Sequence, residues 1–342
     1  MVQLNKLPIP DFYQPEKVGE IYKVDYQQRA VDARRWIEKY NINGAQADEF
    51  KVHLLLVDVQ NTFCIPGFEL FVAGRTGKAA VEDNQRLSAF IYQNLARITK
   101  ITLTMDSHQA IQIFHSIYLI DQDGNHPDPY TLVSVEDIRS GKWRFNPVAA
   151  ETLEIKTEKA QRNLLHYVKA LEKNGKYQLA IWPYHAMLGG IGHAIVPAVE
   201  EAVFFHSVAR YAQPDIHIKG MNPFTEHYSV IGPEVLTDAN GEKIATRNEA
   251  FLHKLERFDL TLVAGQAKSH CVASTIADLL GDIQQVDSSL VKRIVLLEDC
   301  TSPVVVPGMD YTEIADEAFQ RFADAGMKLV KSTESPENWY PD

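Results

Sequence analysis

Short apolar runs alternate with longer amphipathic stretches along this chain. HLLLVDVQ (53–60), KITLTMD (100–106) and LTLVAG (260–265) are nearly continuous apolar runs, which are typical of strands buried on both faces. In residues 84–98 and 158–175 the apolar positions recur every three or four residues, which predicts amphipathic helices. This alternation predicts an α/β fold of three layers, with a mostly parallel central sheet and helices on both faces.

The rest of the pattern extends the same alternation. Further strands are predicted over 177–183, 215–220 and 293–299, and further helices over 24–40 and from near 193, 271 and 312. Gly175 is expected to cap the helix over 158–175, since glycine accepts the backbone conformation that ends a helix. Residues 1–50 are expected to be an N-terminal extension of a domain over 51–342.

The composition narrows the class of protein. The chain has 342 residues, 45% hydrophobic and 23% charged, which is typical of a globular protein. It has no apolar run long enough for a membrane span and no apolar signal-peptide core at its start. Three cysteines in this length fit a reducing cytoplasm, and a net charge of -11 disfavours nucleic acid and anionic membranes as partners.

Polar side chains stand where the predicted strands end. In parallel sheets the ligand crevice lies beyond these carboxyl ends, so they are the place to look for chemistry. Asp58 would be a general base or a hydrogen-bonded structural carboxylate, and Lys219 would stabilise anions or be a solvated lysine. Asp106 and His108 are two residues apart and point the same way on an extended chain, and His185 follows the next predicted strand. One carboxylate and two imidazoles form a plausible divalent-metal site with open positions.

Cys271 follows the strand over 260–265 and opens the next predicted helix. A free cysteine is often a small buried hydrophobic residue, and this is one interpretation. At a helix N-terminus, however, unpaired N–H groups and the helix dipole favour the thiolate, which is the nucleophilic form. The position therefore also fits a catalytic nucleophile.

Five short blocks occur in the order seen in a known family. VDVQNTF, MDSH, WPYH, IKGMNPFTEHYS and VAGQAKSHCVAS together resemble the isochorismatase-like cysteine hydrolases, and most of all their nicotinamidase branch. The resemblance covers about 53–302 and implies an isochorismatase-like, Rossmann-like fold. Residues 1–50 fall outside it, and residues from about 117 to 176 resemble an insertion in the cysteine hydrolase domain.

The resemblance implies a catalytic triad. Carried over to this chain, its members are Asp58, Lys219 and Cys271. It also implies a cis peptide bond between Gln266 and Ala267, which would aim the N–H groups of Ala267 and Cys271 into an oxyanion hole. On this basis Cys271 is predicted to be the nucleophile.

The resemblance further implies one divalent metal, usually zinc and in some members iron or manganese. Its ligands would be Asp106, His108 and His185, and His115 corresponds to a histidine often found near the metal. Aromatic residues that match those lining the family's pyridine pocket are Phe63, Trp182 and Tyr228.

The implied activity is hydrolysis of nicotinamide to nicotinate and ammonia through a thioester. The partner would be a small carboxamide, and the oligomeric state stays open, a homo-oligomer included. Ala186 stands where many nicotinamidases have cysteine, and Lys268-Ser269 replaces a threonine followed by an acid. These departures leave two alternatives, another carboxamide or carbamoyl hydrolase of the superfamily and a non-catalytic metal-binding protein.

Overall fold

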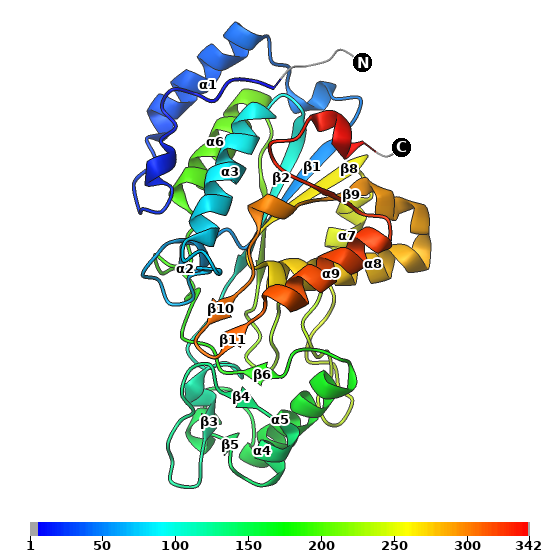
Figure 1. Ribbon diagram of the computed structural model, residues 1–342. Coiled ribbons are helices and arrows are strands. Elements are labelled where there is room, and N and C mark those ends of the chain that lie inside the picture. The colour runs from blue at the N-terminus through cyan, green and yellow to red at the C-terminus, as the bar shows by residue number, and fades with distance from the viewer. Residues whose placement is uncertain (1–5, 341–342) are drawn as a thin grey trace. The chain divides into compact units, whose positions relative to one another are not determined.

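A six-stranded sheet organises the larger part of the structure, a computed structural model that describes residues 6–340 (Figure 1). The strand order is β12–β9–β8–β1–β2–β7, and the pairs β12–β9, β9–β8, β8–β1 and β1–β2 are parallel. The strands are β1 Val52–Val57, β2 Ile98–Asp106, β7 Asp215–Lys219, β8 Leu260–Gly265, β9 Ile294–Leu297 and β12 Lys328–Val330. Every residue of β1, β8 and β9 is buried, as their continuous apolar runs predicted.

Helices cover both faces of this sheet (Figure 1). Helices α3 and α6 lie on one face, and α8 and α9 lie on the other. Besides the short hairpin of β10 Val305–Val306 and β11 Met309–Asp310, this unit contains the helices α1 Tyr26–Tyr40, α2 Asn61–Cys64, α3 Ala79–Gln93, α6 Pro197–Arg210, α7 Glu249–Leu255, α8 Ala273–Val286 and α9 Thr312–Asp324. Among residues 6–340, no helix has the length and apolarity needed to cross a membrane. The predicted α/β layering of a mostly parallel sheet is confirmed.

Helix α1, which precedes the first strand, packs against α6. Trp36 contacts Phe205 of α6, with ring centroids 6.1 Å apart, and the Arg29 guanidinium lies 3.7 Å from the centroid of Phe12. Arg29 also lies 3.8 Å from the carboxylate of Glu201 on α6. Helix α1 therefore adds a further layer outside α6.

The chain divides into two compact units. The sheet unit comprises Met1–Met105, Ala194–His217 and Glu249–Asp342, and the second unit comprises Asp106–His193 and Ile218–Asn248. In the second unit β3 Leu119–Ile120 pairs with β5 Arg144–Phe145, and β4 Leu132–Val133 pairs with β6 Leu179–Ala180, both antiparallel. Its helices are α4 Val135–Arg139 and α5 Thr157–Lys173.

Two predicted elements differ from those observed. The predicted strand over 177–183 is reduced to β6, which pairs with β4 and lies outside the central sheet. The pairing with β4 covers only Leu179 and Ala180, and Trp182 instead forms a bridge with His115. The helix predicted from near 271 is preceded by a π-helical turn, Lys268–Val272, so that α8 itself begins at Ala273. The helix ending near Gly175 is α5, and Gly175 follows the cap residue Asn174 with φ +63°.

The junction of β1 and β8 depends on a residue without a side chain. Gly265 has φ +120°, and a Cβ there would lie 2.0 Å from the carbonyl oxygen of Val57. We expect Gly265→Ala to lower the free energy of unfolding by roughly 3 kcal/mol or more, because neither backbone can move without disturbing the sheet. Denaturant titration would measure the change.

Gly281→Ala in α8 is the matched control, since a Cβ there meets no heavy atom within 4 Å. Alanine should stabilise that helix by about 0.5–1 kcal/mol. Equal unfolding midpoints for the two variants would contradict the close approach at Gly265.

Candidate active site

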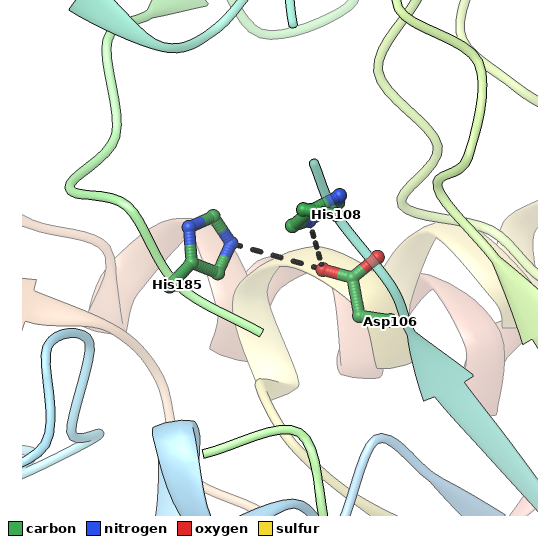
Figure 2. Close-up of side chains that lie close together, drawn as sticks. All are labelled: Asp106, His108 and His185. Atoms are coloured by element: carbon green, nitrogen blue, oxygen red, sulfur yellow. Dashed lines mark hydrogen bonds and ion pairs between the residues drawn. The ribbon is translucent and has the colours of Figure 1, made fainter. Parts of the chain in front are cut away.

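A buried group of one carboxylate and two imidazoles lies in the second unit (Figure 2). Asp106 ends β2, His108 follows two residues later, and His185 comes from the loop after β6. His108 Nε2 lies 2.8 Å and His185 Nε2 3.8 Å from Asp106 Oδ2, and the three ligand atoms lie within 4.8 Å of one another. The three predicted metal ligands are thus brought together, although His185 does not follow a strand of the central sheet.

Backbone carbonyls orient both imidazoles. His108 Nδ1 lies 3.2 Å from the carbonyl oxygen of Gly220, and His185 Nδ1 lies 2.7 Å from that of Pro183. A ring that donates its Nδ1–H to a carbonyl directs Nε2 to the other side, which here is the side of Asp106. Burial lowers the pKa of His185 and so favours the neutral ring that ligates metals.

Lys219 is joined to this group through Asp106. Its Nζ donates to Asp106 Oδ1 at 3.0 Å and to the carbonyl oxygen of His227 at 2.9 Å, and its side chain is buried. Burial alone would raise the pKa of Asp106, but the charges of His108 and Lys219 outweigh it and hold this pKa well below its usual value. The group therefore contains a buried carboxylate that stays ionised.

Gly220 permits this close packing. Its φ is +87°, and a Cβ there would lie 2.7 Å from both Asp106 Oδ1 and His108 Cε1. A glycine directly after Lys219 thus lets the chain pass against two of the candidate ligands.

His115, which was predicted to lie near the metal, is close to this group but is not part of it. The His115 ring centroid is 5.9 Å from those of both His108 and His185, while its Nδ1 faces the carbonyl oxygens of Gln109 and Ala110. Burial lowers the pKa of His115 to about 3, so the ring is neutral, but it is not one of the three grouped ligands.

The predicted pocket aromatics divide between the units. Trp182 Nε1 donates to Tyr228 Oη at 3.0 Å in the second unit, so these two side chains form one pair. Phe63 belongs to the sheet unit, where it is buried in α2. Sequence reasoning missed Glu226, a buried carboxyl two residues before Tyr228 whose pKa is raised by burial to about 7. Its sequence block, FTEHYS, was the available signal.

The candidate thiol site lies in the sheet unit, where β1 and β8 end side by side. Val57 pairs with Gly265, so Asp58 and Gln266 follow at neighbouring positions. In the sheet, β2 lies next to β1 on one side and β9 lies next to β8 on the other. The chain therefore leaves β1 and β8 in opposite directions across the sheet. Such a switch point is where ligands bind in open α/β sheets.

Cys271 lies in the π-helical turn that follows. The Gln266–Ala267 peptide is cis, as the resemblance implied, and the N–H groups of His270 and Val272 donate to the carbonyl oxygen of Ala267 at 3.0 and 3.2 Å. Cys271 is 6% exposed and α8 begins two residues later. The thiol thus stands at the N-terminal end of a helix, as predicted, although inside a π-helical turn.

Asp58 is fully buried and has a left-handed backbone, with φ +46°. The Thr104 hydroxyl donates to Asp58 Oδ1 at 2.5 Å and accepts the Asp58 N–H at 3.1 Å. Thr104 thereby fixes both the backbone and the carboxylate of the candidate base. Sequence reasoning missed it, since a threonine inside a strand carries no signal of its own.

Comparison with known proteins gives structural similarity alone. No protein-family model and no curated protein matches the chain. The yeast nicotinamidase bound to the inhibitor nicotinaldehyde aligns over 82% of this chain and 99% of its own, at 17% identity and a TM-score of 0.50. An Acinetobacter baumanii nicotinamidase aligns over 83% and 97% at 19% identity and a TM-score of 0.48. A Pyrococcus horikoshii pyrazinamidase in complex with zinc aligns over 82% and 99% at 16% identity and a TM-score of 0.43.

The alignment with the yeast enzyme bears on the fold predicted from the five sequence blocks. It extends over nearly the whole of that structure, and the parallel strand pairs and the helices on both faces of the sheet agree with the prediction. The chain has a three-layer α/β fold similar to that of the yeast nicotinamidase.

Proposed function

We propose that this protein is a metal-containing cysteine amidohydrolase that converts nicotinamide and water to nicotinate and ammonia. The observation that carries the proposal is the buried group of Asp106, His108 and His185, with both imidazoles oriented by backbone carbonyls. The sequence resemblance had named these same three residues as the metal ligands.

The proposed chemistry uses Asp58, Lys219 and Cys271. Asp58 takes the thiol proton of Cys271, and Lys219 stabilises the anionic forms of both. The thiolate sulfur attacks the carboxamide carbon, and the N–H groups of Ala267 and Cys271 hold the oxyanion. Asp58 then returns the proton to the leaving nitrogen as the C–N bond breaks and ammonia departs. A water molecule, activated by Asp58, hydrolyses the thioester and restores the thiol.

The donor set fits a divalent metal. One carboxylate and two imidazoles are a common set of protein ligands for zinc, and they suit iron and manganese as well. When bound, the metal would act as a template that holds the ring nitrogen of the substrate. The pocket aromatics in this proposal are Phe63, Trp182 and Tyr228.

Two alternatives share part of this site. The departures from the nicotinamidase pattern, at Ala186 and Lys268-Ser269, lie outside the proposed triad. Because the triad is retained, another carboxamide or carbamoyl hydrolase is favoured over a non-catalytic metal-binding protein. Two measurements distinguish these three candidate functions. They are the metal content of the protein and its release of ammonia from nicotinamide, pyrazinamide, benzamide and an N-carbamoyl amine. Nicotinamide should be the best substrate, and metal-loaded protein that releases no ammonia from any of them would overturn the proposal.

Differential alkylation tests whether Cys271 is activated. Burial raises the pKa of Cys64 and of Cys300, so both thiols are protonated at neutral pH, and each is 1% exposed. Iodoacetamide should therefore modify Cys271 at least about tenfold faster than either, since the thiolate is the reactive form. Peptide mass spectrometry after timed quenching measures the three rates, and equal rates in the folded protein would count against a nucleophilic Cys271.

A further inference from the structure

A groove lies at the amino ends of the sheet strands, on the edge opposite Asp58 and Cys271. It is formed around the starts of β1, β2, β7 and β8 within the sheet unit and encloses about 620 Å³. That volume is within the range of small-molecule sites, roughly 300–1,000 Å³. The catalytic proposal makes no use of this groove.

The groove is strongly cationic. Four basic side chains line it, and Asp215 is the one acidic residue among its lining residues. Across the whole chain the balance is the reverse, with 34 Lys and Arg against 45 Asp and Glu. The basic residues are Lys51, Lys100, Lys254 and Arg257.

Two of these cations share one carboxylate, and the other two have no ion-pair partner among residues 6–340. Asp215 lies 3.0 Å from Lys100 Nζ and 3.5 Å from Lys254 Nζ, so one carboxylate serves both. Lys51 and Arg257 are exposed, and neither side chain forms an ion pair with any residue of 6–340. Their charges are therefore available to an anion.

Two nearby carboxylates, those of Asp48 and Asp259, are not among the lining residues of the groove. Asp259 accepts the backbone N–H of Lys51 at 2.8 Å. Asp48 accepts two hydrogen bonds of 2.5 Å from Arg210 and one of 2.6 Å from the Thr99 hydroxyl. The net positive field of the groove comes from its lining residues, which carry four positive charges against the one negative charge of Asp215.

Aromatic residues form part of the wall. Tyr211 is 69% exposed and is held in a left-handed conformation as the cap of α6, with its N–H on the carbonyl oxygen of Ser207. Phe258 stacks on His53, with ring centroids 4.6 Å apart, and is thereby fixed. An exposed, anchored tyrosine beside cations offers a flat surface on which a planar ring can stack.

We propose that this groove binds a mononucleotide, with the phosphate on Lys51 and Arg257 and the base against Tyr211. The planar guanidinium of Arg257 can donate to two phosphate oxygens at once, and the ammonium of Lys51 adds a second positive charge. The proposal is independent of the amidohydrolase activity, because it concerns the other edge of the sheet.

Isothermal titration of the full-length protein with AMP, adenosine and ribose 5-phosphate tests it. AMP should bind with a dissociation constant below about 1 mM, and the other two should bind at least about tenfold more weakly because each lacks one recognised group. Lys51→Glu with Arg257→Glu should weaken AMP binding by at least about tenfold.

The matched control is Lys17→Glu with Lys292→Glu, which makes the same charge change at exposed lysines outside the groove. It should leave AMP affinity within about twofold, and both double variants should keep the melting temperature of the parent. Absence of AMP binding, equal weakening by the two double variants, or equal binding of adenosine would overturn the proposal. Equal binding of ribose 5-phosphate would overturn the stacking on Tyr211.

Discussion

Replacement of Cys271 by alanine is expected to lower kcat for carboxamide hydrolysis by roughly 10⁴-fold or more. The proposed reaction begins with attack by this sulfur, and no other described thiol is comparably exposed. Loss of a nucleophile removes a transition-state interaction that binding and the oxyanion hole replace only in part. The measurement is steady-state ammonia release from nicotinamide over a range of substrate concentrations.

Three companion measurements make the result specific. Cys271→Ala should keep the metal content and melting temperature of the parent, because the metal group belongs to the other unit. Cys300→Ala, at a buried thiol whose pKa is raised by burial, should keep its activity. Cys271→Ser preserves the shape of the site, so full activity in that variant would show that the sulfur is not the nucleophile.

Replacement of His185 by alanine is expected to weaken metal affinity by roughly 100-fold or more. It removes one of three grouped ligands, whereas loss of even an outer hydrogen-bond partner of a metal site costs about 10–100-fold. Substrate binding should weaken in parallel, because the metal is proposed to hold the ring nitrogen. Competition with a chromogenic chelator measures the affinity, and the KM for nicotinamide reports the second effect.

His126→Ala is the control for this change. His126 is an exposed histidine of the same unit, and its Nδ1 faces the carbonyl oxygen of Leu119. It should leave metal affinity unchanged. If His185→Ala binds the metal as tightly as the parent does, His185 is not a ligand, and the site would need another donor.

The central strands could be predicted from the sequence because they are buried on both faces. Helices on either side leave few polar positions in β1, β8 and β9, and each strand therefore appears as a nearly continuous apolar run. A carboxylate where a strand ends, such as Asp58 directly after β1 or Asp106 as the last residue of β2, stands out for the same reason.

The segment around His185 could not be predicted in this way. A short apolar run such as LAIW (179–182) is consistent with a sheet strand, but the local sequence does not determine which strand it will pair with. In the structure it pairs with β4 of the second unit, and only over Leu179 and Ala180. His185 nevertheless reaches Asp106, because a loop rather than a strand carries it there.

The sequence by itself determined the α/β class, the strand ends and the types of side chain that stand on them. Only the tertiary structure decided how those side chains are held. The Thr104 hydroxyl fixes Asp58, the Gly220 carbonyl orients His108, and Lys219 is bonded to Asp106. Burial patterns are local and repeat along the chain, whereas these contacts join residues 46, 112 and 113 positions apart and exist only once the chain has folded.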